Sequence, residues 1–422
     1  MPEPNIRRAV LANGVRLATE RLPHVRSVAV GIWLTRGSRH EPADTAGIAH
    51  FVEHMLFKGT PARSAEAIAQ QVDSIGGQID AFTSKEYAGY YLKVLDEHLP
   101  LAVEILADLI CNPLFANDDI EREKKVILEE IKMVEDTPDD LVHEIFAEGF
   151  WSNHPLGRPI LGTPQSVAAI DRATLKNYFA NTYVASNFVV VAVGNLEHER
   201  VQDLLERALA DAPHQGPAAN QAPPRVSTGV QIRKKDLEQS HIVFGTEALP
   251  QHHPDRYAGY ALNTTLGGSM SSRLFQNVRE KRGLAYSVFS GLSAYQDAGA
   301  LSIYAGCANE AVAELIDVVV AEIRQMKADG LDADELRRAK DHLKGSLMLS
   351  LESTSSRMSH LARQEMYRDQ PFGLDEMLAN IERVTAGDVL KLADRFFGNG
   401  PLAVTVLGNV NGLQVTKEQL AL

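Results

Sequence analysis

The pattern of apolar and polar positions repeats along the chain, so that its second half follows the same order of segments as its first. Each half shows an apolar strand-like run, a helical segment, strand signals, two further helical segments, and a closing helix with a buried strand. The strand-like runs lie at 27–35, 77–94 and 187–195 and again at 241–249, 284–306 and 401–409, and the paired helical segments lie near 98–111 and 118–136 and again near 309–328 and 332–350. A repeat of roughly 210 residues is far longer than that of a solenoid and indicates a duplicated domain.

The two copies are separated by segment 211–228, which is rich in proline, glycine and small polar residues and has no hydrophobic period. This composition is typical of a linker. We therefore expect an N-terminal domain at 1–210 and a homologous C-terminal domain at 229–422. Because each copy mixes antiparallel strand signals with consecutive helices, the expected fold class is α+β: two homologous α/β domains whose antiparallel-rich sheets are flanked by helices.

Composition and charge narrow the classes of partner and compartment. The 422 residues carry a net charge of −13, whereas a nucleic-acid-binding protein usually presents a basic face. Cys111 and Cys307 are far apart and form no CxxC pattern, as expected in a reducing compartment. No apolar run approaches the roughly 20 residues that span a bilayer, and the first residues lack the pattern of a targeting peptide. We expect a cytoplasmic protein with neither nucleic acid nor membrane as partner.

The strongest chemical motif is His50-Phe51-Val52-Glu53-His54, within a predicted helix at 45–57. Residues four apart lie one above the other on a helix, so His50 and His54 can direct their imidazoles at one ion, and Glu53 can reach a water on it. This is the H-x-x-E-H arrangement of inverted zinc peptidases. Zinc held by two imidazoles and a carboxylate lowers the pKa of water, and a glutamate accepts the proton during attack on a carbonyl. The alternative is a pair of structural histidines on an amphipathic helix.

A third ligand is expected on the charged helix at 118–136, which carries Glu121, Glu123, Glu129 and Glu130. Such a charge run usually marks a solvated face, and the pattern alone does not choose among these glutamates. Glu123 and Glu130 are two turns apart and share a face, and two carboxylates turned inward would need a counter-ion. A second H-E start, at His143-Glu144, fails because Ala147 stands where a second histidine is needed.

At these residues the sequence resembles the pitrilysin-type peptidases, in the branch of mitochondrial processing peptidase β subunits and their bacterial relatives, over nearly the whole chain. In that family a glutamate ligand follows the inverted motif by about 76 residues, which implies Glu130 as the third ligand of one zinc ion per chain. The family has another carboxylate on the same helix, and its position matches Glu123. The resemblance implies that Glu123 orients the ligating groups without binding the metal itself.

Two further segments carry the resemblance. The first, Gly76-Gly77-Gln78-Ile79-Asp80-Ala81-Phe82-Thr83, is similar to an edge strand that pairs with extended substrates, which implies substrate contacts by Gly77, Asp80, Ala81, Phe82 and Thr83. Asp80 stands where the family commonly has asparagine. The second segment, 274–286, is similar to a segment of the family that carries an Arg/Tyr pair seven residues apart. This resemblance implies that Arg279 holds substrate carbonyls and that Tyr286 donates to the oxyanion. Without the resemblance, a plain sheet strand, a surface arginine and a packed tyrosine would be expected.

The second copy lacks the metal motif, since Gly259, Leu262 and Asn263 align with His50, Glu53 and His54. The sequence therefore predicts a zinc-dependent endopeptidase that cleaves extended, unstructured peptides or protein termini, with Glu53, Arg279 and Tyr286 as catalytic residues. Family members close a chamber with four such domains, so the resemblance implies a homodimer with composite active sites. The alternatives are a non-catalytic core-type subunit and an activating partner of a separate catalytic chain.

Overall fold

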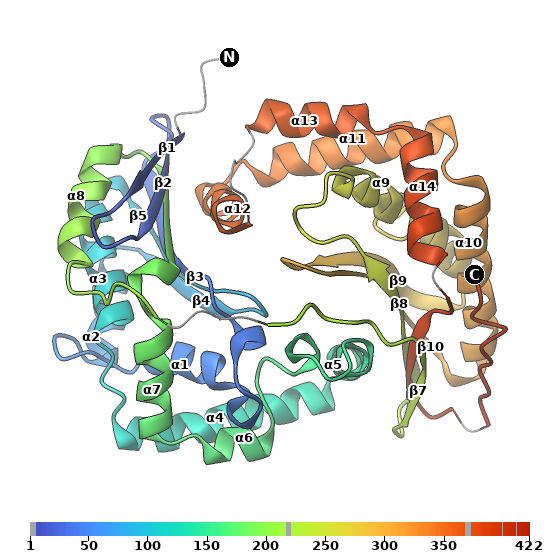
Figure 1. Ribbon diagram of the computed structural model, residues 1–422, viewed down its shortest axis with the longest axis horizontal. Coiled ribbons are helices and arrows are strands. Elements are labelled where there is room, and N and C mark those ends of the chain that lie inside the picture. The colour runs from blue at the N-terminus through green and yellow to red at the C-terminus, as the bar shows by residue number, and fades with distance from the viewer. Residues whose placement is uncertain (1–5, 217–220, 368–372, 399, 411) are drawn as a thin grey trace. The chain divides into compact units, whose positions relative to one another are not determined.

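The computed structural model describes residues 6–216, 221–367, 373–398, 400–410 and 412–422, which form two compact units (Figure 1). The first unit comprises Met1–Met133, Arg158–Gln221 and Ser350–Pro371, and the second comprises Val134–Gly157, Ala222–Leu349 and Phe372–Leu422. Each unit contains one sheet with helices on both faces. Residues 217–220 of the predicted linker lie outside the described residues.

The sheet of the first unit has the strand order β1-β2-β6-β3-β5-β4. Its strands are β1 (Ile6–Val10), β2 (Arg16–Arg21), β3 (Ser27–Leu34), β4 (Gln78–Thr83), β5 (Ala88–Leu95) and β6 (Phe188–Gly194). Only the β2–β6 pair is parallel, and the remaining pairs are antiparallel. Strand β4 therefore forms one edge of this sheet.

The sheet of the second unit repeats this order as β7-β11-β8-β10-β9. Its strands are β7 (Gly229–Lys234), β8 (Gln239–Ala248), β9 (Ala285–Ala294), β10 (Gly299–Ala308) and β11 (Ala403–Gly408). The single parallel pair, β7–β11, occupies the position of β2–β6, and the edge strand β9 occupies the position of β4. The predicted fold class, two homologous α/β domains with antiparallel-rich sheets, is confirmed.

Alternate residues of the first sheet enter two separate apolar cores, because successive side chains of a strand point to opposite faces. Val28, Val30 and Ile32 pack in the core that contains helix α3 (Leu99–Cys111). Ala29 and Trp33 face the other way, against helix α12 (Thr354–Tyr367). The second sheet follows the same rule: one face packs against α9 (Arg256–Leu266), α10 (Val312–Asp329) and α14 (Ala386–Phe397), and the other packs against α5 (Pro138–Phe150).

The two helices α5 and α12 are absent from the sequence prediction, and each belongs to the unit built mainly from the other half of the chain. Their apolar stripes show that each buries one face, but a stripe does not say which sheet it covers. The compact units are therefore interleaved in sequence, whereas the expected domains 1–210 and 229–422 mark the two copies of the repeat. That assignment stays a prediction.

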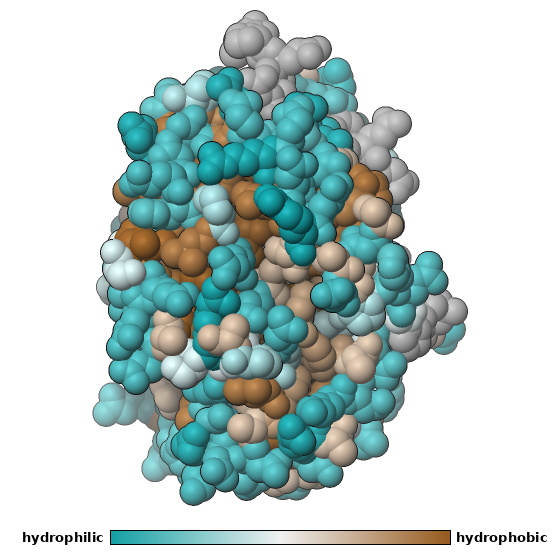
Figure 2. All heavy atoms as spheres, turned by 90° about the vertical axis from the view of Figure 1, so that its left-hand side faces the viewer, coloured by the Kyte–Doolittle hydropathy of each residue, from teal (hydrophilic) through white to brown (hydrophobic). Residues whose placement is uncertain are grey.

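Helices α1 (Ile48–Leu56), α4 (Asn117–Asp136) and α11 (Ala333–Ser350) lie at predicted helical segments, and α7 (Arg172–Thr182) is the helix before the closing strand of the first half. The sequence prediction does not place four other helices, which are α2 (Ala65–Ser74), α6 (Pro164–Ala169), α8 (His198–Ala208) and α13 (Leu374–Arg383). Most of the surface on the side of α3 and α8 is hydrophilic, with apolar residues showing in patches between (Figure 2). Among the described residues, every helix is too short or too polar to cross a membrane.

Candidate metal centre

Helix α1 begins later than the sequence predicts, at Ile48 instead of residue 45, because a glycine breaks the chain direction before it. Gly47 has φ +96, in the left-handed region that favours glycine. A Cβ at this position would also lie 2.6 Å from the carbonyl oxygen of Leu161. From there the helix buries Phe51, Val52 and Met55 in the core, which turns His50, Glu53 and His54 to one side.

His50 and His54 meet Glu130 of α4 at one point, and their ligand atoms lie within 4.8 Å of one another. Nε2 of His50 is 3.7 Å from Oε2 of Glu130, and Nε2 of His54 is 3.7 Å from its Oε1. Two atoms bound at about 2.0–2.1 Å to a tetrahedral zinc would be about 3.4 Å apart, so these two distances are close to those of a zinc site. Burial and the neighbouring His54 lower the pKa of His50 to about 4, which keeps that imidazole neutral and able to bind a metal.

Glu123 lies behind His54 on the same face of α4, as the two-turn spacing from Glu130 predicts. Its Oε2 is 3.0 Å from Nδ1 of His54, so the carboxylate accepts the Nδ1–H and leaves the lone pair of Nε2 for the ion. Its Oε1 is 2.7 Å from Nζ of Lys58. Glu123 is only 6% exposed, and Lys58 is the counter-ion that a buried carboxylate requires.

Glu123→Gln should weaken zinc binding by about tenfold, the lower end of the ~10–100-fold range for residues that orient a metal ligand. The amide oxygen still accepts the His54 proton, but the charge that makes the imidazole more basic is gone. A competition titration with a chromophoric chelator measures the change. Lys124→Met on the same helix is the control, because Lys124 pairs with Glu121 and should leave the affinity unchanged.

Glu53 is held by a residue of the edge strand. Oγ1 of Thr83 donates to Oε2 of Glu53 at 2.5 Å. Burial raises the pKa of Glu53, the Thr83 bond opposes this rise, and the charges of Asp80 and Glu130 add to it. A carboxyl group with a raised pKa beside a metal-ligand set is suited to accept a proton from water.

Strand β4 offers its outer edge beside this group, since α1 and β4 are in contact. The N–H of Ser84 bonds the carbonyl oxygen of Tyr87 at 2.8 Å, and by alternation the backbone groups of Ala81 and Thr83 point away from β5. The outward N–H of Ala81 donates to Oδ1 of its own neighbour, Asp80, at 2.8 Å. The residues expected to contact substrate, Gly77, Asp80, Ala81, Phe82 and Thr83, thus lie on or next to a free strand edge, and their contacts with substrate stay a prediction.

Arg279 and Tyr286 lie together in the second unit. Cζ of Arg279 is 4.8 Å from the ring centroid of Tyr286 and 4.8 Å from that of Phe275. A six-residue π-helix, Phe275–Glu280, carries the arginine, and such irregular turns are frequent at functional sites. Tyr286 is the second residue of the edge strand β9 and is 79% exposed. Their catalytic roles stay a prediction.

Helix α9 of the second unit corresponds to α1 of the first, because each is the first α-helix after the equivalent strand, β8 or β3. Gly259 and Leu262 replace His50 and Glu53 there, and Asn263 replaces His54. Oδ1 of Asn263 accepts a hydrogen bond from Ser290 at 2.8 Å. Among the described residues, the only group of three or more potential metal ligands is His50, His54 and Glu130.

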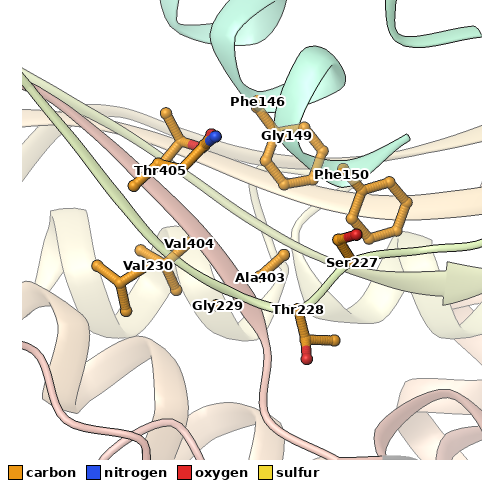
Figure 3. Close-up of a pocket in the computed structure, with 11 residues that line it drawn as sticks. Phe146, Gly149, Phe150, Ser227, Thr228, Gly229, Val230, Ala403, Val404 and Thr405 are labelled. Atoms are coloured by element: carbon orange, nitrogen blue, oxygen red, sulfur yellow. The ribbon is translucent and has the colours of Figure 1, made fainter. Parts of the chain in front are cut away.

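The second unit contains a pocket of about 180 Å³ whose lining differs from the candidate metal-ligand group (Figure 3). Phe146 and Phe150 of α5 line one side, and the starts of β7 and β11 line the other. None of its lining residues is charged, so it contains no acid, base or metal ligand.

Two contacts of the site went unnoticed in the sequence. Lys58 follows His54 by four residues, just beyond the end of α1, so a basic residue at this spacing was a usable signal for a counter-ion. Thr83 was expected to touch substrate, but its bond to Glu53 joins residues 30 positions apart and leaves no local pattern.

An inverted His-x-x-Glu-His helix with a distal glutamate, here in a duplicated α/β fold, is characteristic of one class of zinc metallopeptidases. Comparisons with known proteins agree: residues 16–164 match the insulinase family, peptidase family M16, and residues 169–343 match the peptidase M16 inactive domain. The chain is 43% identical to the uncharacterized zinc protease YmxG of Bacillus subtilis, covering 93% of this chain and 96% of that one. It is 40% identical to an uncharacterized zinc protease of Mycobacterium leprae, covering 98% and 94%.

This chain belongs to the peptidase M16 family, and the enzyme class predicted from its sequence, a zinc metallopeptidase, is confirmed at that level. Two solved structures share its fold. A peptidase M16 inactive domain from Pseudomonas fluorescens superposes with a TM-score of 0.91 at 21% identity, covering 97% of this chain and 99% of that one. A protease from Helicobacter pylori gives 0.89 at 23% identity, covering 96% and 99%.

Proposed function

We propose that the chain is an endopeptidase that hydrolyses extended, unstructured peptides or protein termini with one zinc ion per chain. The observation that carries this proposal is the convergence of His50, His54 and Glu130 beside the half-buried carboxyl group of Glu53. Bound zinc supplies a Lewis acid that lowers the pKa of water and polarises a carbonyl. Every other part of the reaction is assigned to side chains and backbone of the chain itself.

Glu53 accepts the proton of the attacking water and passes it to the leaving amine. Its carboxyl group is suited to this exchange because burial raises its pKa towards neutrality, while Thr83 fixes one oxygen and leaves the other for the proton. Glu123 keeps the His54 ring in one tautomer and orientation throughout. Because Glu53 both accepts the proton and returns it to the amine, the proposed reaction needs no second acid from the first unit.

Strand β4 recognises the backbone of the substrate. Ala81 and Thr83 present outward N–H and carbonyl groups, to which an extended peptide can add as a further strand. A folded domain has its backbone groups already paired, so this mode selects unstructured segments. The Ala81 N–H is held by Asp80, and a bound peptide would have to displace that bond.

Arg279 and Tyr286 complete the active site in the proposed mechanism. Arg279 holds substrate carbonyls, and the Tyr286 hydroxyl donates to the oxyanion that forms on attack. Donors of this kind contribute about 3–4 kcal/mol of transition-state stabilisation in acyl transfer. The exposed position of Tyr286 and its contact with the guanidinium support a role in binding a ligand.

The proposal is tested by incubating the purified chain with a mixed library of unstructured peptides, with and without a chelator, and sequencing the products. Internal cleavages that disappear with the chelator and return with zinc support an endopeptidase. Trimming of terminal residues alone would contradict the endopeptidase assignment. No turnover by the zinc-loaded chain would instead favour a non-catalytic or activating subunit.

We further propose that the active enzyme is a homodimer in which Arg279 and Tyr286 serve the zinc site of the partner subunit. The resemblance to pitrilysin-type peptidases implies a chamber of four domains, of which this chain supplies two. The chain carries both the zinc ligands and the Arg/Tyr pair, so two copies suffice. Closed two-fold dimers are the commonest assembly of this kind.

Mixing two inactive variants should restore activity if the sites are shared between subunits. Glu53→Gln and Tyr286→Phe chains should each be nearly inactive alone. After subunit exchange at equal amounts, about half of the dimers are mixed and each has one intact site, so about a quarter of wild-type activity should return. Exchange verified by a tag, without recovered activity, would show that Tyr286 serves its own chain or no site at all.

A further inference from the structure

Glu41 is a buried carboxylate at the start of the metal-binding helix. The residue is 4% exposed and lies on the loop that precedes α1. Its Oε2 accepts the N–H of Gly47 at 2.8 Å, and its Oε1 accepts the N–H of Ala49 at 2.8 Å. Both donors belong to the first turn of α1, whose N–H groups have no partner within the helix. One side chain thus fixes the beginning of the helix at two points.

Burying a carboxylate costs free energy unless the group is well hydrogen-bonded, so a buried glutamate at this place calls for a structural reason. Burial raises the pKa of Glu41 to about 7, while the Ala49 and Gly47 bonds and the positive charges of Lys85 and Arg158 oppose the rise. Burial raises the pKa of Tyr178 on α7 well above its usual value, and the charge of Glu41 adds to this rise. Arg158 itself donates to the backbone carbonyl of Glu41 at 3.1 Å, which ties the loop in place.

The two metal-binding histidines are oriented by different means. Nδ1 of His54 bonds Glu123, which fixes that ring from behind. Nδ1 of His50 is buried and has no hydrogen-bond partner within the part of the chain that the structure describes. Ligating histidines usually donate their second N–H to a fixed acceptor. For His50, which directly follows Ala49, the orientation must therefore come from the backbone of α1 and from packing.

We propose that Glu41 is a positioning residue that sets the first turn of α1 and thereby aims His50 at the metal. This inference rests on the proposed zinc site and adds a residue to it. Ser166 supports the same turn, because its Oγ donates to the carbonyl oxygen of Ala46 at 2.7 Å. Within the described residues, His50 has no hydrogen bond at Nδ1 that would orient its ring. Glu41 instead fixes the backbone from which His50 extends, through its bonds to Gly47 and Ala49.

The test compares zinc affinity in Glu41→Gln and Glu20→Gln, measured by competition with a chromophoric chelator, together with thermal unfolding of the zinc-free proteins. Glutamine keeps the shape of Glu41 but accepts only one of the two N–H bonds and turns an amide N–H against the other. Glu20 on strand β2 is a matched control, because it is also buried and its Oε1 accepts a hydrogen bond from Arg357 at 2.6 Å. Both variants should unfold at a lower temperature, but only Glu41→Gln should bind zinc about tenfold more weakly.

Glu41→Asp is the second variant, because it keeps the buried charge yet is too short to reach both N–H groups. It should also weaken zinc binding. Wild-type affinity in Glu41→Asp and Glu41→Gln, or an equal loss in Glu20→Gln, would overturn the positioning role. A wild-type chain that fails to bind zinc would count against the metal centre itself, so the two failures are distinguishable.

Discussion

Glu53→Gln is expected to lower kcat for peptide hydrolysis by about 10³-fold, within the ~10²–10⁴-fold range of general acid–base catalysis, while zinc content stays at the wild-type level. Glutamine has the same shape and can still accept the Thr83 hydrogen bond, but it cannot take a proton from water. Glu53 is not among the three residues that form the candidate metal-ligand group. Hydrolysis of a quenched fluorescent peptide and elemental analysis of the same sample measure the two quantities.

Glu66→Gln on α2 is the control for this change, because Glu66 is exposed and its Oε1 accepts a hydrogen bond from Gln70 on the same helix. It should keep both kcat and zinc. A Glu53→Gln enzyme with more than about a tenth of wild-type kcat would contradict the role of general base. Loss of zinc from that variant would instead place Glu53 among the ligands.

Glu130→Gln is expected to weaken zinc binding by more than about 100-fold, beyond the ~10–100-fold effect of residues that only support a ligand. The neutral amide replaces a charged carboxylate whose two oxygens lie 3.7 Å from Nε2 of His50 and 3.7 Å from Nε2 of His54. The loss is measured by chelator competition and should be accompanied by loss of hydrolysis that added zinc restores only in part.

Glu129→Gln is the matched control, one residue earlier on the same helix. Glu129 faces about 100° away and pairs with Lys132 at 2.7 Å on the surface. Its replacement should leave zinc affinity and kcat unchanged. If Glu129→Gln loses the metal and Glu130→Gln keeps it, the assignment of the third ligand is wrong by one residue.

The residues of the metal helix could be predicted from sequence because the relevant signals are local. The spacing of His50 and His54 is a property of one helix, and the apolar positions Phe51 and Val52 show which side is buried. The third ligand was not determined by pattern, because Glu123 and Glu130 share a face and only family resemblance separated them. The structure now distinguishes them by their partners: Glu123 bonds His54 and Lys58, whereas Glu130 faces both imidazoles.

The parts that the sequence did not predict depend on contacts between distant residues. The bond from Thr83 to Glu53 and the two bonds that Glu41 accepts follow from how strands and loops pack around α1. The late start of α1 depends on the left-handed conformation at Gly47, which only the neighbouring Leu161 segment explains. An amphipathic stripe likewise does not show that α5 and α12 each pack in the unit built mainly from the other half of the chain.

The central claim is that this chain hydrolyses peptide bonds with zinc at His50, His54 and Glu130. The most direct measurement removes all metal from the purified protein, adds zinc in increments, and follows cleavage of an unstructured peptide against bound zinc. We predict no cleavage by the metal-free protein and a rate that rises linearly and levels off at one zinc ion per chain. Unchanged cleavage without metal, or a fully zinc-loaded protein that leaves the peptide intact, would contradict the claim.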